Sequence, residues 1–462
     1  MHNISIHRPS LLFTLIIILF AAFSIHTAPA RSDENLDDIL SGFTESENHT
    51  EVTTNKKLPP WIDISGSLTI GTSWNFAQKS PDPGRPDYRG ISMLRTTAAL
   101  NTDFNINSWQ ARISGHGFYD AAWHYNDRDL YTDRFLDSME DEFEFDDFYI
   151  AGSLANHLDI KIGRQVVVWG KADNVRVTDV LNPLNNQTPG MVDIKYRRLP
   201  VCMGKLDYYT GSWNLSTILI QEVRFDKNPI FNSEFYPGTM PMPQEKNPAP
   251  FSPDIRQYGI ALNGIFSGWD ISFYRARIYD NRAHITTDSG MVLREHNRVS
   301  MTGITCNMAW GNLLFKGEGA FWQDLEFGAV PNQDFNRIDL MAGLEYTGFS
   351  ETMVSLEVVN RHINNFDHRL TLAPDFARKD LLQTVLMMTK DFANDTVQLK
   401  ILCSIFGPKG NDGAFERAQL EYNLSDHTTL TLGFVLYQTG DLPGFSTIGS
   451  SDRIFFEYKY AF

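Results

Sequence analysis

The side chains best suited to contact a solute lie together in one segment of the chain. The segment contains Gly163-Arg164-Gln165, Trp169-Gly170, Asp173 and Asn182-Pro183. A guanidinium, an amide, an indole and a carboxylate can bind and orient a polar molecule. The sequence holds neither a Gly-x-Ser-x-Gly turn nor a His-Glu-x-x-His helix, the usual marks of hydrolytic chemistry. The segment therefore predicts a binding site or pore constriction, not a catalytic centre, formed by Arg164, Gln165, Trp169 and Asp173.

Two further candidates for this constriction are Arg112 and His116, which share the polar face of one predicted strand. Two other interpretations remain open. Each inward-facing charge can instead belong to a structural ion pair between neighbouring strands. The segment can also be a conformational motif that only anchors a loop, with Gly163, Gly170, Asn182 and Pro183 as its structural residues.

Alternation of apolar and polar residues predicts the elements that position these side chains. In the last stretch of the chain, aromatic and aliphatic residues occupy every even position, namely Ile454, Phe456, Tyr458, Tyr460 and Phe462. Only a β-strand places such residues on one face. Phe455 is the single exception. The ending with Tyr458, Tyr460 and Phe462 also resembles the C-terminal signal of bacterial outer-membrane barrels, which their assembly machinery recognises.

The connections between the predicted strands alternate between short turns and long loops. A barrel inserted from the periplasm has this order, because its periplasmic turns are short and its extracellular loops are long. We therefore predict an all-β fold, a transmembrane antiparallel up-and-down β-barrel over residues 60–462. The count of segments gives about 18 strands, with 16 as the alternative. The polar faces carry charges of both signs, among them Lys316, Glu318 and Glu357, which must face water because lipid disfavours them.

The start of the chain predicts export. Residues 1–30 have the form of a signal peptide, with an apolar run over 11–23 and Ala28-Pro29-Ala30 as the cleavage site. Residues 31–59 are polar and acidic and are interpreted as a disordered periplasmic leader. The net charge of −16 argues against a nucleic-acid partner. The predicted location is the outer membrane of a Gram-negative bacterium, with membrane lipid and the barrel-assembly machinery as partners.

The alternation fails at Gly163, where simple parity directs Arg164 toward lipid. A glycine bulge at this position would reverse the register and bring Arg164 into the lumen. After Trp169 the chain enters a segment without strand pattern, residues 170–199. Long loops in compact folds are usually functional. This inserted loop is predicted to fold into the barrel and narrow the pore.

The residues Gly163-Arg164-Gln165, Trp169-Gly170 and Asn182-Pro183 resemble the motif of the porin-like outer-membrane proteins grouped as domain of unknown function 1302. The resemblance is clearest over residues 158–200. It implies an outer-membrane barrel, often encoded with inner-membrane pumps and periplasmic lipid-carrier-like proteins. It also implies transport of small molecules, with hydrophobic or lipidic compounds as the suggested cargo.

Three classes of function follow. The first is a channel or transporter with a constricted lumen. The alternative is a secretion or envelope-assembly component that works with periplasmic and inner-membrane partners. An enzyme is not expected, because no residue spacing supplies a nucleophile, a base or a metal site. No cofactor and no metal are expected.

Overall fold

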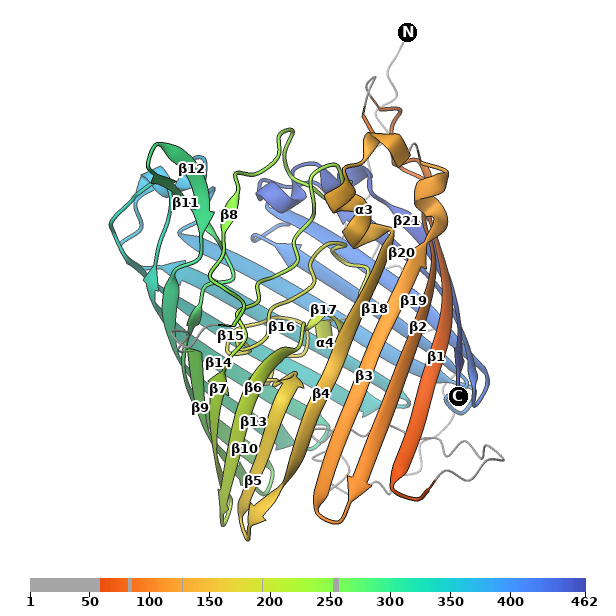
Figure 1. Ribbon diagram of the computed structural model, residues 1–462, viewed down its shortest axis with the longest axis vertical. Helices are drawn as coiled ribbons and strands as arrows, with labels where there is room; N and C mark the ends of the chain where they lie inside the picture. Colours follow the sequence, from red (N-terminus) through yellow and green to blue (C-terminus); the bar gives the residue numbers. More distant parts are fainter. Residues whose placement is uncertain (1–58, 82–84, 127, 193, 252–256) are drawn as a thin grey trace.

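The computed structural model describes residues 59–81, 85–126, 128–192, 194–251 and 257–462. Its main body is one antiparallel sheet of 18 strands, in which every strand pairs with the next along the wall and the first pairs with the last. Figure 1 shows the closed wall from the side. The strands are β1 (Ile62–Asn75), β2 (Gly90–Ile106), β3 (Trp109–Asp120), β4 (Asp141–Ala155), β5 (Leu158–Gln165), β6 (Val201–Thr210), β7 (Trp213–Ile220), β9 (Gln257–Phe266), β10 (Trp269–Tyr279), β13 (Arg298–Trp310), β14 (Leu313–Leu325), β15 (Phe335–Phe349), β16 (Thr352–Ile363), β17 (Asp380–Phe392), β18 (Val397–Phe406), β19 (Gly413–Ser425), β20 (Thr428–Gln438) and β21 (Arg453–Ala461).

This architecture confirms the predicted barrel and its 18 strands, and it excludes the alternative of 16. The predicted signal peptide, residues 1–30, and all but the last residue of the predicted leader, residues 31–59, lie outside the described part of the chain. No helix in the described ranges is long and apolar enough to cross a bilayer.

The remaining elements are short and lie in the connections. They are a small sheet of β8 (Glu245–Lys246), β11 (His284–Asp288) and β12 (Met291–Glu295), the helices α3 (Asp133–Met139) and α4 (Ile194–Arg197), and the 3-10 turns η2 (Ala121–His124), η3 (Arg128–Leu130), η4 (His368–Thr371), η5 (Pro443–Phe445) and η6 (Ile448–Ser450). Figure 1 places α3 and the small sheet at the long-loop end of the barrel and α4 within the outline of the wall.

Short and long connections alternate around the barrel as the sequence predicted. The turn after β2 contains Asn107 with a φ of +57°, and the turn after β4 contains His157 with a φ of +71°. Positive φ values fit such tight hairpins, and Asn adopts them more readily than most residues. The first residue of β1, Ile62, pairs with Phe104 near the short turn after β2. The barrel therefore begins on the short-turn side, and the last strand, β21, ends on the same side. All the long loops therefore gather at the opposite end.

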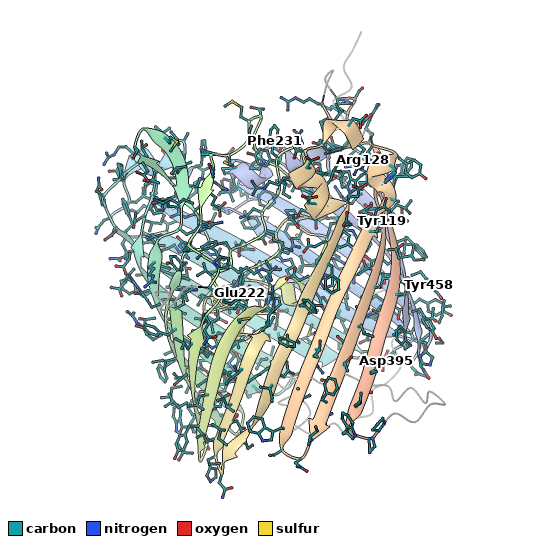
Figure 2. The ribbon with its side chains drawn as sticks, in the orientation of Figure 1. Tyr119, Arg128, Glu222, Phe231, Asp395 and Tyr458 are labelled. Atoms are coloured by element: carbon teal, nitrogen blue, oxygen red, sulfur yellow. The ribbon has the colours of Figure 1, made fainter. Side chains whose placement is uncertain are left out.

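The last strand follows the predicted parity. Tyr458 and Tyr460 are exposed on the outer face, which is apolar and aromatic, and Figure 2 labels Tyr458 on the wall. Phe455, the exception in the pattern, points inward and is buried in a cluster with Phe235 and Tyr437. An apolar residue on the water-facing side is tolerated here, because a long loop packs against it.

Strand β4 carries a bulge where it pairs with β3. Ile113 pairs with Phe148, and Gly115 pairs with Phe145, so two residues of β4 face one residue of β3. The parity of β4 therefore changes within the strand, and Phe145 and Phe148 both face outward. The hydroxyl of Ser114 accepts a hydrogen bond from the freed backbone N–H of Asp147 at 2.8 Å. A simple alternation count cannot follow such a change.

The bulge predicted at Gly163 is wrong. The pairing of β5 with β4 and with β6 passes Gly163 without a change of register. Gly163 is required for a different reason. Its φ is +131°, and a Cβ there would overlap the carbonyl oxygen of Phe148 and lie 2.7 Å from Cα of Tyr149. The glycine thus allows β4 and β5 to approach closely in a backbone conformation that other residues rarely adopt.

Replacing Gly163 with alanine is expected to destabilise the barrel strongly, by about 3 kcal/mol or more, because the new methyl group collides with rigid backbone. The matched control is Gly204→Ala on the adjacent strand β6, where a Cβ meets nothing within 4 Å. The stability of both variants is measured as the temperature at which the folded barrel loses the fast migration of its compact form in SDS gels. Equal midpoints for the two variants would contradict this account.

Candidate functional site

A long segment between β5 and β6 leaves the wall and crosses the inside of the barrel. This insertion comprises residues 166–200 and contains α4. Its hydrogen bonds reach strands on distant parts of the wall, namely β14, β16, β19 and β20. The predicted loop at 170–199 falls within it, and its contacts place it in the lumen.

The first anchor is the carboxylate of Glu318, which projects inward from β14. It accepts the backbone N–H of Ala172 at 2.7 Å, that of Thr178 at 3.2 Å and the Thr178 hydroxyl at 2.9 Å. The N–H of Lys171 donates to it as well. The bend of the insertion thus wraps around a single buried side chain. A Cβ on Gly170, whose φ is +93°, would lie 2.7 Å from Glu318 Oε1, so only glycine fits there.

Further charged contacts hold the same bend. Glu357 on β16 accepts the backbone N–H groups of Asp173 and Asn174 at 2.7 and 3.0 Å. Lys316 pairs with Asp173 and also with Glu345, the latter at 3.0 Å. Hydrogen bonds to ionised groups are among the stronger ones in proteins. Several of them, largely shielded from water, fix this part of the insertion firmly to the wall.

The later part of the insertion is fastened to another region of the wall. The hydroxyl of Tyr437 on β20 donates to the carbonyl oxygen of Pro189 at 2.7 Å. The guanidinium of Arg417 on β19 donates to the carbonyl oxygens of Gly190 and Met191. The insertion therefore spans the lumen from β14 and β16 to β19 and β20.

Asn182 connects the start of the insertion with its end. Its amide Nδ2 donates to the carbonyl oxygens of Gln165 and Leu199 at 3.2 and 3.0 Å, while its Oδ1 accepts the N–H of Val167 at 2.8 Å. The carbonyl oxygen of Pro183 accepts the N–H of Leu199 at 2.7 Å. Asn182 is fully buried. These contacts explain the asparagine in the middle of the segment, because its side chain bonds to residues at both ends of the insertion.

Replacing Asn182 with alanine is expected to loosen the insertion while leaving the barrel closed. Three buried backbone groups would lose their partner, at a cost of about 3 kcal/mol. Limited proteolysis in detergent should cut residues 166–200 faster than in the wild type. Asn185→Ala is the control, because the Asn185 side chain accepts the nearby N–H of Gln187 at 3.1 Å and forms no other hydrogen bond within the described ranges. Equal cleavage of the two variants would show that Asn182 is not the fastening residue.

The other residues proposed for the constriction lie in different settings. Trp169 is buried and stacks on Tyr274 of β10, with ring centroids 4.8 Å apart. Gln165 is fully buried, and its amide donates to the carbonyl oxygen of Met203 at 3.1 Å. Neither side chain offers surface to a passing solute, so both act as anchors of the insertion. Asp173 is half exposed in its pair with Lys316.

Arg164 lies at the point where the insertion leaves the wall. Its guanidinium is 3.3 Å from Glu144 and 3.4 Å from Glu222. It reaches these carboxylates although the register of β5 continues unbroken from Ile162 to Arg164. Figure 2 labels Glu222 in the middle of the barrel outline.

Arg112 and His116 form ion pairs with neighbouring strands of the wall. The guanidinium of Arg112 is 2.7 Å from Asp103 on β2, and Nδ1 of His116 is 2.8 Å from Asp146 on β4. Both contacts join adjacent strands, which is the structural alternative that the sequence left open. The functional roles of Glu318, Glu357 and Lys316 were not recognised from sequence, although their inward parity was. No group of three potential metal-binding side chains occurs among the described residues.

A cavity of about 220 Å³ remains beside the insertion. Its wall side comes from β1, β2 and β21, and its inner side from the insertion and from the loop between β7 and β9. Among the lining residues are Met93, Arg95, Met191, Glu234, Arg453 and Glu457. We call this space the β1–β2 cavity. It shows that the insertion leaves room inside the barrel on the side away from its Glu318 anchor.

Known structures share this architecture. Acinetobacter baumannii OccAB2 is similar with a TM-score of 0.51 and 9% identity, covering 87% of this chain and 98% of that protein. Acinetobacter baumannii OccAB1 is similar with a TM-score of 0.51 and 10% identity, covering 87% of this chain and 96% of that protein. At such low identity the likeness concerns the fold alone. No curated protein sequence matches this one.

The family model described as "Protein of unknown function (DUF1302)" matches residues 12–462, nearly the whole chain. This match confirms the resemblance carried by Gly163-Arg164-Gln165, Trp169-Gly170 and Asn182-Pro183. It also extends the resemblance over all 18 strands of the barrel. The chain therefore belongs to the DUF1302 family of outer-membrane β-barrel proteins.

Proposed function

We propose that this protein is an outer-membrane channel through which small molecules pass beside a fixed, inward-folded insertion. The observation that carries the proposal is the fastening of residues 166–200 across the lumen by wall residues such as Glu318 and Tyr437. A barrel of this size is too wide for its own side chains to fill, so a folded insertion sets the width of the passage.

The outer membrane of a Gram-negative bacterium is the proposed location. The outward aromatic and aliphatic side chains of β21 support it, because such a surface suits hydrocarbon and the membrane interface. Membrane lipid and the barrel-assembly machinery are the proposed partners, together with a periplasmic lipid-carrier or an inner-membrane pump. The proposed cargo includes hydrophobic compounds, since methionine side chains such as Met93 and Met191 line the remaining cavity.

Planar-bilayer recording tests this function. The purified protein should give stepwise currents, and a variant in which a short Gly-Ser linker replaces residues 171–197 should conduct several times more current. Liposome uptake of a sugar and of an apolar solute would compare the two classes of cargo. A folded barrel that carries no current would overturn the channel and favour a secretion or envelope-assembly role.

A further inference from the structure

We propose that the β1–β2 cavity is a binding site for a small amphipathic amine, a molecule with an apolar body and one cationic hydrogen-bond donor. The proposal rests on the proposed function, because it names the class of solute that the passage beside the insertion would select. It is argued from the shape, the lining and the charge of the cavity.

The glycine at the centre of β1, Gly71, leaves part of the cavity open. A Cβ on Gly71 would lie 3.1 Å from Cε of Met93 and 3.5 Å from Cγ of Glu457. Gly71 has ordinary strand geometry, so its role here is to leave space and not to allow an unusual backbone. Any larger side chain at this position would extend into the space that Met93 and Glu457 border.

The size of the cavity fits a small molecule or one segment of a longer one. A dry protein cavity of about 150 Å³ holds benzene, which has six non-hydrogen atoms. By proportion, the 220 Å³ found here holds a molecule of about nine non-hydrogen atoms. An aromatic ring with a two-carbon amine has this size.

Apolar side chains cover much of the cavity. Met93, Met139 and Met191 come from β2, α3 and the insertion, and Phe235 comes from the loop between β7 and β9. Methionine is flexible and polarisable, so it adapts to ligands of different shape. These residues can pack against the apolar body of the ligand and adjust to its shape.

The two arginines at the cavity are already neutralised. Arg95 lies 3.2 Å from Asp120, and its guanidinium also lies 3.9 Å from the ring centroid of Phe118. Arg453 is buried and pairs with Glu234, whose carboxylate also accepts from Asn75 at 3.2 Å. A carboxylate or phosphate ligand would have to break one of these pairs. The cavity is therefore a poor site for anions.

Two of the lining groups can still accept a hydrogen bond from a ligand. Glu457 has no hydrogen bond and no ion pair within 4 Å among the residues that the structure describes. The hydroxyl of Ser233 is buried and has no hydrogen-bond partner there. The charged groups that line the cavity, two arginines against Asp120, Glu234 and Glu457, sum to −1, and outside the lining Arg417 and Lys459 also interact electrostatically with Glu457. An ammonium group satisfies this unpaired carboxylate, and an alcohol satisfies it less well because it carries no charge.

Calorimetric titration of the full-length protein in detergent tests the site with three matched probes, 2-phenylethylamine, 2-phenylethanol and phenylacetate. We expect the amine to bind most tightly, the alcohol more weakly and the acid not measurably. In Glu457→Gln the amine should lose about tenfold in affinity, the size expected for loss of a charge-assisted hydrogen bond, while the alcohol should be unaffected. Asp207→Asn on β6, outside the cavity, is the matched control and should bind as the wild type does.

A second variant separates binding in the cavity from binding elsewhere. Gly71→Leu fills the space, so it should weaken the amine and the alcohol alike, provided the variant keeps the gel mobility of a folded barrel. Glu457→Gln keeps the proposal falsifiable if Gly71→Leu does not fold. Equal binding of amine and acid, or amine binding that survives Glu457→Gln, would overturn the proposal. The titration requires no current, so a barrel that binds the amine but does not conduct would refute the channel and leave the site.

Discussion

Replacing Glu318 with alanine is expected to release the insertion and to raise the conductance of the barrel severalfold. The carboxylate accepts the N–H groups of Lys171, Ala172 and Thr178 and the Thr178 hydroxyl. Its removal leaves all four donors without their acceptor in a site shielded from water, at a cost of about 3–5 kcal/mol. The bend that fits around Glu318 should then lose its single conformation. Single-channel recording should show larger currents with more frequent fluctuations.

The matched control is Glu421→Ala on β19. The Glu421 carboxylate pairs with Lys400 at 3.1 Å and forms no hydrogen bond to the insertion in the described part of the chain. The Glu421→Ala substitution removes one lumenal negative charge, as Glu318→Ala does. It therefore controls for the effect of charge on the current. If Glu318→Ala conducts as the wild type does while the barrel remains folded, the insertion is not the element that limits the passage.

Deleting Phe462 is expected to remove most of the folded protein from the outer membrane. The backbone of Phe462 exchanges two hydrogen bonds with Gly66 on β1, at 2.8 and 3.0 Å. Its ring lies over Gly66, where a Cβ would be 2.6 Å from Cζ of the phenylalanine. These contacts close one end of the seam between the first and last strands, and their loss costs about 2 kcal/mol. The larger effect is expected on assembly, because the terminal aromatic residue resembles the signal that the machinery reads.

Two measurements separate these effects. Refolding of the purified variant into detergent reports the loss of contacts and should succeed nearly as well as for the wild type. The amount of heat-modifiable barrel in cell membranes reports assembly and should fall steeply. Tyr422→Ala, which removes an exposed aromatic residue from β19, should assemble normally. Normal membrane levels of the Phe462 deletion would show that the terminal residue is not recognised in this protein.

The failures of the sequence interpretation share one origin. At Gly163 the pattern suggested a bulge, whereas the structure shows a close contact with the backbone of β4. A bulge lies instead in β4, where Asp146 and Asp147 face Ser114 of β3. Trp169 was expected at the constriction, but Tyr274 covers its ring. In each case the deciding neighbour belongs to another strand, and a single strand's pattern carries no record of it.

The sequence by itself determined the barrel. Strand parity is a local property, since successive side chains face hydrocarbon and water in turn, and Ile454 to Phe462 display it without any partner. The alternation of short and long connections likewise predicted about 18 strands, and the structure decided between 18 and the alternative of 16. The tertiary structure alone decided how the insertion is held, because Ala172 and Glu318 lie 146 positions apart and Asp173 and Glu357 lie 184 apart. Such pairs meet only after the wall has closed, and closure depends on every strand at once.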